Sequence, residues 1–115
     1  MPELAEAPVF DVDQLRNICM EDTELMRELA TSLIDDATAQ IPALKDAVEQ
    51  ADGTRCARLA HYVKGACANV GAASLAALMK NIEHSAAAGD FAACRASLGN
   101  IPMELEKFSS ETASL

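Results

Sequence analysis

The residues best suited to chemistry in this chain lie in the stretch LAHYVKGACANVGA, from Leu59 to Ala72. It places His61 among alanines and other apolar residues, with Lys64 and Gly65 three and four positions later. An imidazole with the ordinary pKa of about 6.5 offers a neutral, nucleophilic nitrogen at cellular pH. A glycine inside a helix costs roughly 1 kcal/mol relative to alanine, so helix stability does not explain Gly65.

Helical periodicity predicts that this histidine faces solvent. At about 100° per residue, the apolar stripe of the segment is centred near Leu59 and Val63, and His61 lies almost opposite it. Lys64 lies on the flank of that outer side. The residues that share the outer side are mostly small or cationic: Thr54, Arg58, Gly65 and Ala68. The small ones would let the backbone of a partner come close to the imidazole.

Other chemistries have weaker support, and spacing alone would also allow an ordinary surface histidine. His61 and His84 fall on different predicted helices, and no Glu-x-x-His pair of the di-iron bundles occurs, so we expect no metal site. The chain has no nucleophile elbow, P-loop or kinase glycine-rich loop, so we expect no ATP binding. A di-metal or redox bundle enzyme stays open as a minor alternative.

Composition and charge restrict the class of protein further. The 115 residues are 50% hydrophobic but only 3% aromatic, which favours aliphatic side chains in close-packed helices. The net charge of −9 repels phosphate backbones and anionic membrane surfaces. No apolar run reaches the roughly 18 residues of a membrane span, and the first residues do not resemble a signal peptide. We therefore expect a cytoplasmic protein that binds neither nucleic acid nor membranes.

The four cysteines are predicted to be structural. They are widely scattered and form no C-x-x-C pair, which argues against zinc and thioredoxin-like chemistry. Cys56, Cys67 and Cys94 fall on apolar stripes. We expect small buried thiols in a reducing compartment.

The spacing of apolar residues predicts five helical segments. A short helix is predicted after Asp11, which can cap it. A long helix from about 23 to 51 can be capped by Asp22, and Pro42 inside it should bend it. The next two cover about 54–70 and 75–86. The last, capped by Asp90, covers 91–108 with a kink at 99–102. The prediction is an all-α, up-down-up-down four-helix bundle over residues 9–108 with a short extra N-terminal helix. Flexible tails are expected at 1–8 and 109–115.

Several of these residues together resemble a known family. The matching residues are Ala60-His61-Tyr62-Val63-Lys64-Gly65, Ala68-Asn69-Val70-Gly71-Ala72, Leu75, Ile82-Glu83 and Gly89-Asp90. The cluster is similar to a histidine-containing phosphotransfer (HPt) domain, from about Phe10 to Phe108. Val63 and Ala66 depart from a commoner leucine and serine, and the interruption at 99–102 is less usual.

The resemblance implies a histidine phosphocarrier of a two-component phosphorelay, without a kinase site of its own. His61 would accept a phosphoryl group from a receiver-domain aspartate and pass it to another. Lys64 would neutralise charge on the phosphoryl oxygens, and Glu83 would hydrogen-bond the imidazole ring. The partner would dock over Arg58, Gly65 and Ala68.

The resemblance also implies the partners, which are the receiver domains of hybrid histidine kinases and response regulators. Mg²⁺ would come from the receiver, because this chain has no metal cluster or cofactor of its own. We expect a monomer, since nothing suggests an apolar face beyond that of the bundle. The alternative is a helical interaction module that binds receivers or other partners without phosphotransfer.

Overall fold

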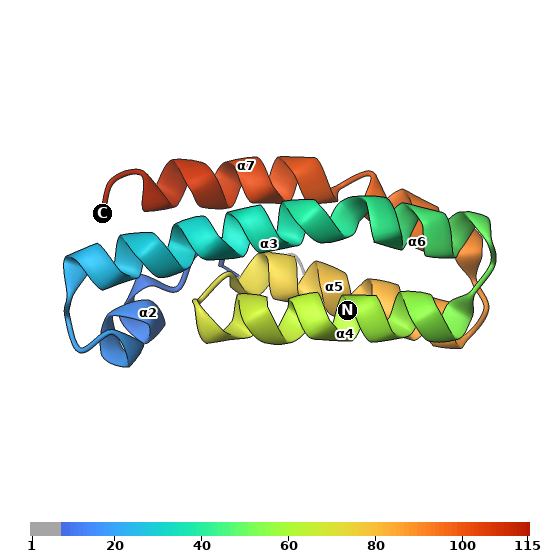
Figure 1. The fold of residues 1–115 in the computed structure, drawn as a ribbon, viewed down its shortest axis with the longest axis horizontal. Helices are drawn as coiled ribbons and strands as arrows, with labels where there is room; N and C mark the ends of the chain where they lie inside the picture. The colour runs from blue at the N-terminus through green and yellow to red at the C-terminus, as the bar shows by residue number, and fades with distance from the viewer. Residues whose placement is uncertain (1–7) are drawn as a thin grey trace.

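Helices account for most of residues 8–115, the part of the chain that the computed structural model describes (Figure 1). They are α2 (Val12–Ile18), α3 (Thr23–Glu49), α4 (Gly53–Asn69), α5 (Ala73–Ala87), α6 (Phe91–Leu98) and α7 (Ile101–Thr112). Helices α3, α4, α5 and the α6–α7 pair run along the long axis in alternating directions, and α2 lies across one end. No strand occurs among these residues, so the predicted all-α fold is confirmed. The predicted tail at 1–8 lies almost wholly outside the described residues.

Aspartate side chains begin four of the helices. Asp11, Asp22, Asp52 and Asp90 each accept a hydrogen bond from the backbone N–H three residues later, at 3.1–3.2 Å. Such a cap satisfies one of the N–H groups that the first helical turn leaves without a partner. The caps predicted at Asp11, Asp22 and Asp90 are confirmed, and they keep the connections between the helices short.

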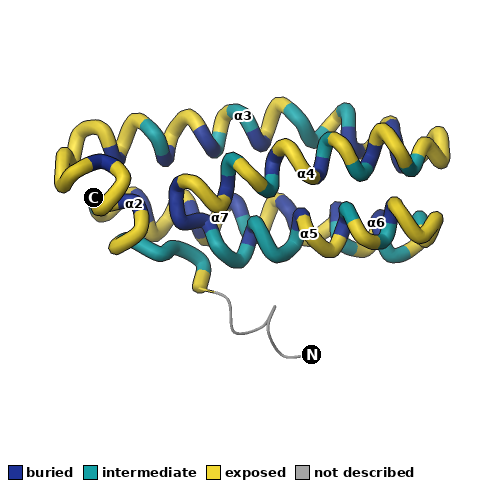
Figure 2. The backbone as a smooth tube through the Cα atoms, turned by 90° about the horizontal axis from the view of Figure 1, so that it is seen from below, coloured by how far each residue is buried: buried dark blue, intermediate teal, exposed yellow. Residues whose placement is uncertain are grey.

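Each long helix buries one stripe and leaves the other side in solvent (Figure 2). The core consists mainly of aliphatic side chains, with Phe108 as its largest fully buried member. All four cysteines are buried and free, as predicted. Phe10 packs edge-on against Phe108, with 5.3 Å between the ring centroids, and so attaches the chain before α2 to the bundle. Within residues 8–115, no helix combines the length and apolar character needed to cross a membrane.

The last part of the chain differs from the prediction in two ways. Helical hydrogen bonding breaks between α6 and α7, although Gly99 and Asn100 both keep right-handed φ and ψ values. Pro102 cannot donate a backbone hydrogen bond, which accounts for the break, while the buried stripe continues in phase. The predicted tail at 109–115 is wrong in part, because α7 continues to Thr112. The buried hydroxyl of Thr112 donates to the Phe108 carbonyl at 3.0 Å.

Helix α2 is held at the turn between α4 and α5. The Asp11 N–H donates to the Gly71 carbonyl at 2.7 Å, and the Ser74 N–H donates to the Pro8 carbonyl at 2.8 Å. The Gln14 side-chain amide also donates to the Ala68 carbonyl. Gly71 has a φ of +80°, and a Cβ there would lie 2.4 Å from the Asp11 carbonyl oxygen. This turn therefore requires glycine both for its conformation and for the close approach of the chain before α2.

Alanine substitutions at two glycines should have opposite effects on stability. Gly71→Ala combines a positive φ with a backbone clash, and such strain costs about 1–3 kcal/mol. At Gly65 an added Cβ meets nothing within 4 Å, so Gly65→Ala should stabilise the protein by roughly 0.5–1 kcal/mol. Urea unfolding followed by circular dichroism measures both changes. An unchanged midpoint for Gly71→Ala would contradict the attachment described here.

Candidate functional site

The rotation of α4 about its axis places His61 in solvent. Ala60, Val63 and Cys67 are buried in the core, and the His61 side chain on the opposite side is 67% exposed. The exposure predicted for His61 is therefore confirmed. His84 on α5 is exposed as well.

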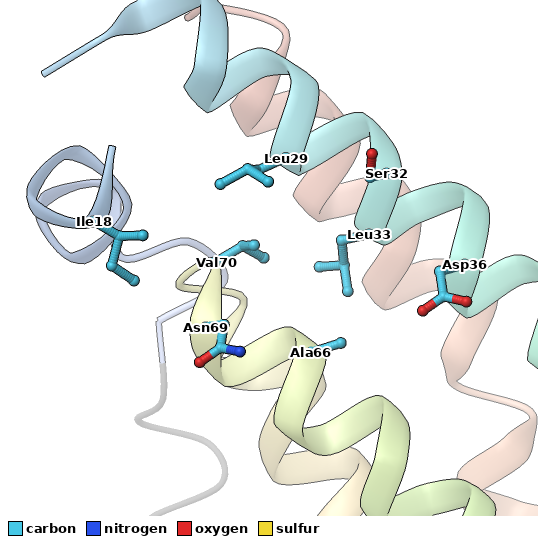
Figure 3. Close-up of a pocket in the computed structure, with 8 residues that line it drawn as sticks. All are labelled: Ile18, Leu29, Ser32, Leu33, Asp36, Ala66, Asn69 and Val70. Carbon is cyan, nitrogen blue, oxygen red and sulfur yellow. The ribbon is translucent and has the colours of Figure 1, made fainter. Parts of the chain in front are cut away.

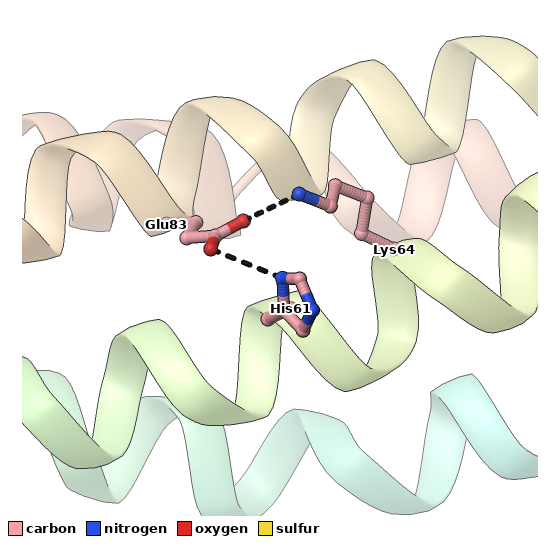
Figure 4. Close-up of polar contacts among 3 residues, drawn as sticks. All are labelled: His61, Lys64 and Glu83. Atoms are coloured by element: carbon pink, nitrogen blue, oxygen red, sulfur yellow. Dashed lines mark hydrogen bonds and ion pairs between the residues drawn. The ribbon is translucent and has the colours of Figure 1, made fainter.

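Close packing of α4 against α5 brings a carboxylate to this histidine. At the start of α4, a Cβ on Gly53 would lie 2.7 Å from the backbone oxygen of Ala86 on α5, so the two backbones approach closely. The helices are antiparallel, and farther along the pair Glu83 lies beside His61 (Figure 4). Gly53 thus allows the two helix backbones to approach closely at the start of α4.

Glu83 bridges the two other residues of the predicted site. Its Oε2 lies 3.1 Å from Nδ1 of His61, and its Oε1 accepts a hydrogen bond from Nζ of Lys64 at 2.8 Å (Figure 4). The structure therefore brings His61, Lys64 and Glu83 together. Lys64 turns toward α5, and its side chain is only 28% exposed. In this structure the lysine neutralises Glu83.

The contact with Glu83 determines which ring nitrogen of His61 can act as a nucleophile. An ionised carboxylate can only accept hydrogen bonds, so the Nδ1 atom that faces it carries the proton. In the neutral imidazole the lone pair then lies on Nε2, at the side of the ring away from Glu83. The exposed nitrogen is the nucleophilic one.

The electrostatics of the site lower the pKa of Glu83. The hydrogen bond from Lys64 is the largest influence and holds the pKa of Glu83 below its ordinary value of 4.5. Partial burial acts in the opposite direction, and the charges of Lys64 and His61 lower the pKa further. The carboxylate is thus an acceptor throughout the neutral pH range.

The residues predicted to dock a partner lie on the exposed side of α4. Arg58, Gly65 and Ala68 are all exposed, and a Cβ on Gly65 would enter open space. Packing inside the protein therefore does not require Gly65. No three His, Cys, Asp or Glu side chains within residues 8–115 are grouped so that they could hold a metal ion.

Sequence analysis missed a groove on the other side of α4. This groove has a volume of about 670 Å³ and lies between α3 and α4, with Ile18 of α2 at one end (Figure 3). Near it, the Tyr62 hydroxyl of α4 donates to Oδ2 of Asp36 on α3 at 3.0 Å. Apolar spacing along α3 does not distinguish residues of the core from residues that line a groove. Only the crossing of the helices shows that part of it lines a groove.

Comparison with known proteins decides the family. The model of the Hpt domain family matches residues 28–111, which is most of the chain. The chain belongs to the Hpt domain family. Members of this family are histidine phosphotransfer modules of phosphorelays and carry no kinase site. The family match begins within α3, so α2 lies before it.

A solved structure confirms the fold of this Hpt domain. The crystal structure of histidine-containing phosphotransfer protein B (HptB) from Pseudomonas aeruginosa PAO1 superposes with a TM-score of 0.81. The two chains are 24% identical, and the match covers 96% of this chain and 99% of HptB. No curated protein matches the chain by sequence. The predicted four-helix bundle is therefore the fold that this Hpt domain shares with HptB.

Replacing Lys64 with methionine should raise the pKa of Glu83 toward 4.5, because the hydrogen bond that lowers it is lost. A lowered folded-state pKa contributes stability above the unfolded-state value, and this stability is lost as the pH falls through the folded value. The stability difference between the parent and Lys64→Met should therefore be largest near neutrality and shrink in acid. An NMR titration of the Glu83 carboxyl carbon, with urea unfolding at several pH values, measures both effects.

The control is Lys45→Met, which removes an exposed lysine of α3 outside the site. It should leave the titration of Glu83 unchanged. An equal shift in both variants would mean that overall charge, and not the contact with Lys64, lowers the pKa.

Proposed function

We propose that this Hpt domain carries a phosphoryl group on His61 between the aspartates of two receiver domains. The observation that supports this most directly is the exposed imidazole whose Nδ1 faces Glu83 at 3.1 Å. A ring fixed in this way presents Nε2 to solvent, with open space one turn away at Gly65. Phosphoryl transfer needs mainly such positioning, together with charge neutralisation.

In the proposed reaction the lone pair of Nε2 attacks the phosphorus of an aspartyl phosphate on the donor receiver. The bond between phosphorus and the aspartyl oxygen breaks, and the aspartate leaves as a carboxylate. The Nδ1 proton stays on the ring, and Glu83 stabilises the positive charge that develops there. In the second transfer a carboxylate of the next receiver attacks the phosphorus, and the neutral imidazole leaves.

Lys64 has two roles in this proposal. In the free protein its hydrogen bond, at 2.8 Å, lowers the pKa of Glu83. After transfer, it would turn from Glu83 toward the phosphoryl oxygens, whose charge attracts it. The exchange requires only rotation of the flexible lysine side chain.

The partners in this proposal are receiver domains of hybrid histidine kinases and of response regulators. They would supply Mg²⁺ at their own acidic residues and dock over Arg58, Gly65 and Ala68. The carrier would meet both partners as a monomer in the cytoplasm. Its own contribution is the positioned imidazole.

His61→Gln should abolish labelling by ³²P-phosphorylated receiver domains of the source organism. The fold should be retained because the residue is exposed, so helical circular dichroism and the melting temperature should change little. His84→Gln is the matched control and should be labelled like the parent. Acid-labile label in His61→Gln would remove this residue from the mechanism. A parent that binds receivers but is never labelled would instead indicate an interaction module.

Gly65→Gln should reduce transfer from a receiver strongly while the protein stays folded. The position is exposed and open, so the longer side chain fits the monomer. It would nevertheless stand between the imidazole and the incoming aspartyl phosphate, where the reacting atoms must approach to about 3–3.5 Å. Gly65→Ala is the smaller control and should lose much less activity. Transfer at the parental rate in Gly65→Gln would place the docking face elsewhere.

A further inference from the structure

A second cleft lies between α3 and the junction of α6 and α7, away from the proposed site. These helices form one side of the bundle in Figure 1, whereas α4 and α5, which carry His61 and Glu83, form the other side. The residues that line the cleft are Ile41, Lys45, Val48, Glu49, Arg95, Leu98, Gly99 and Pro102. Its volume of about 370 Å³ is within the range of small-molecule sites. A ligand bound there would leave His61 accessible.

The charged and the apolar residues of this cleft lie toward opposite ends. Lys45 and Glu49 follow Ile41 by about one and two turns of α3. Helix α6 runs in the opposite direction to α3, so Arg95 lies toward the end of Glu49, and Pro102 lies toward the end of Ile41. The cleft therefore has a charged end and an apolar end.

The two cations of the cleft have no ion-pair partner in the part of the chain that the structure describes. No salt bridge within residues 8–115 includes Lys45 or Arg95, although Glu49 lines the same cleft. The chain has 18 acidic residues against 9 basic ones, so a shortage of carboxylates does not explain this. An anion in the cleft could accept hydrogen bonds from α3 and α6 at once.

Gly99 keeps the cleft open next to Pro102. Its φ of −62° is one that any residue adopts, and an added Cβ would have the Ala96 carbonyl oxygen as its nearest contact, at 3.4 Å. Neither the backbone conformation nor internal packing therefore requires glycine here. What the missing side chain provides is room beside the apolar residues of the cleft.

We propose that this cleft binds a small amphiphilic carboxylate. The carboxylate accepts hydrogen bonds from Lys45 and Arg95, and its hydrocarbon chain lies toward Ile41 and Pro102, where it is removed from water. With Glu49 included, the two cations leave the lining with one net positive charge. That charge is complementary to a single carboxylate rather than to a doubly charged phosphate group.

The first test titrates the ¹⁵N-labelled protein with decanoate, below its critical micelle concentration, and follows the binding by NMR. Shifts should be concentrated at residues 41–49 and 95–102 and at the side-chain N–H of Arg95. Decyltrimethylammonium has the same chain with the opposite charge, and acetate has the charge without the chain. Each should bind at least about ten-fold more weakly than decanoate. Equal binding of either compound, or decanoate shifts centred on the groove between α3 and α4, would overturn the proposal.

Substitutions of the cleft residues should change decanoate affinity in opposite directions. Lys45→Gln and Arg95→Gln should each weaken binding by about five- to ten-fold, because each removes a charge-assisted hydrogen bond. Glu49→Gln should strengthen it by about two-fold or more, because a like charge is removed. Gly99→Leu should prevent binding by filling the space beside Pro102. These four positions are exposed, so the variants should keep the helical circular dichroism of the parent.

The matched control is Lys80→Gln, which removes an exposed lysine of α5 that does not line the cleft. It should bind decanoate like the parent. An equal loss of affinity in Lys80→Gln and Lys45→Gln would mean that overall charge attracts the anion, and unchanged affinity in both Lys45→Gln and Arg95→Gln would also contradict the site. His61→Gln should bind decanoate normally, so the outcome does not depend on whether His61 carries a phosphoryl group.

Discussion

The shared carboxylate of Glu83 is the interaction on which the proposed site depends. One oxygen contacts the imidazole and the other accepts from Lys64, so a single side chain of α5 organises two residues of α4. Removing either partner would leave the carboxylate half satisfied, and removing the carboxylate would release both. These contacts join α4 to α5, whose backbones also approach closely where Gly53 faces Ala86.

The two sides of α4 carry different types of residues. Toward α5 lie Lys64 and Glu83, and Glu83 contacts the imidazole. Toward α3 lies a groove whose lining includes the polar residues Ser32, Asp36 and Asn69 as well as apolar ones. His61 lies between them on the outer surface of α4, where it is accessible to a large partner.

Helix α2 contributes Ile18 to the groove, although it lies before the residues matched by the family model. Its position depends on backbone hydrogen bonds at the turn around Gly71, where a side chain would clash. Those bonds place Ile18 at the end of the groove. The requirement for glycine at position 71 thus affects the groove that Ile18 lines.

Several features were determined by the sequence itself, because they depend on neighbours along the chain. Aspartate caps and the apolar period predicted the helices closely, and the same period predicted that His61 is exposed. Residue types along the chain predicted the C-terminal region less well. A kink was expected at 99–102, and the helix instead breaks between α6 and α7. Thr112 continues the spacing of Leu105 and Phe108, but as a polar residue it was not counted in the buried stripe.

Only the tertiary structure decided the partners of the long side chains. Lys64 was expected to await a phosphoryl group, yet it contacts Glu83, and Tyr62 contacts Asp36 across a groove that the sequence did not indicate. These pairs join residues of different helices, whose meeting depends on the crossing and rotation of the helix axes. Periodicity within one helix determines which side of that helix faces outward, whereas the packing between helices determines what each exposed side chain meets there.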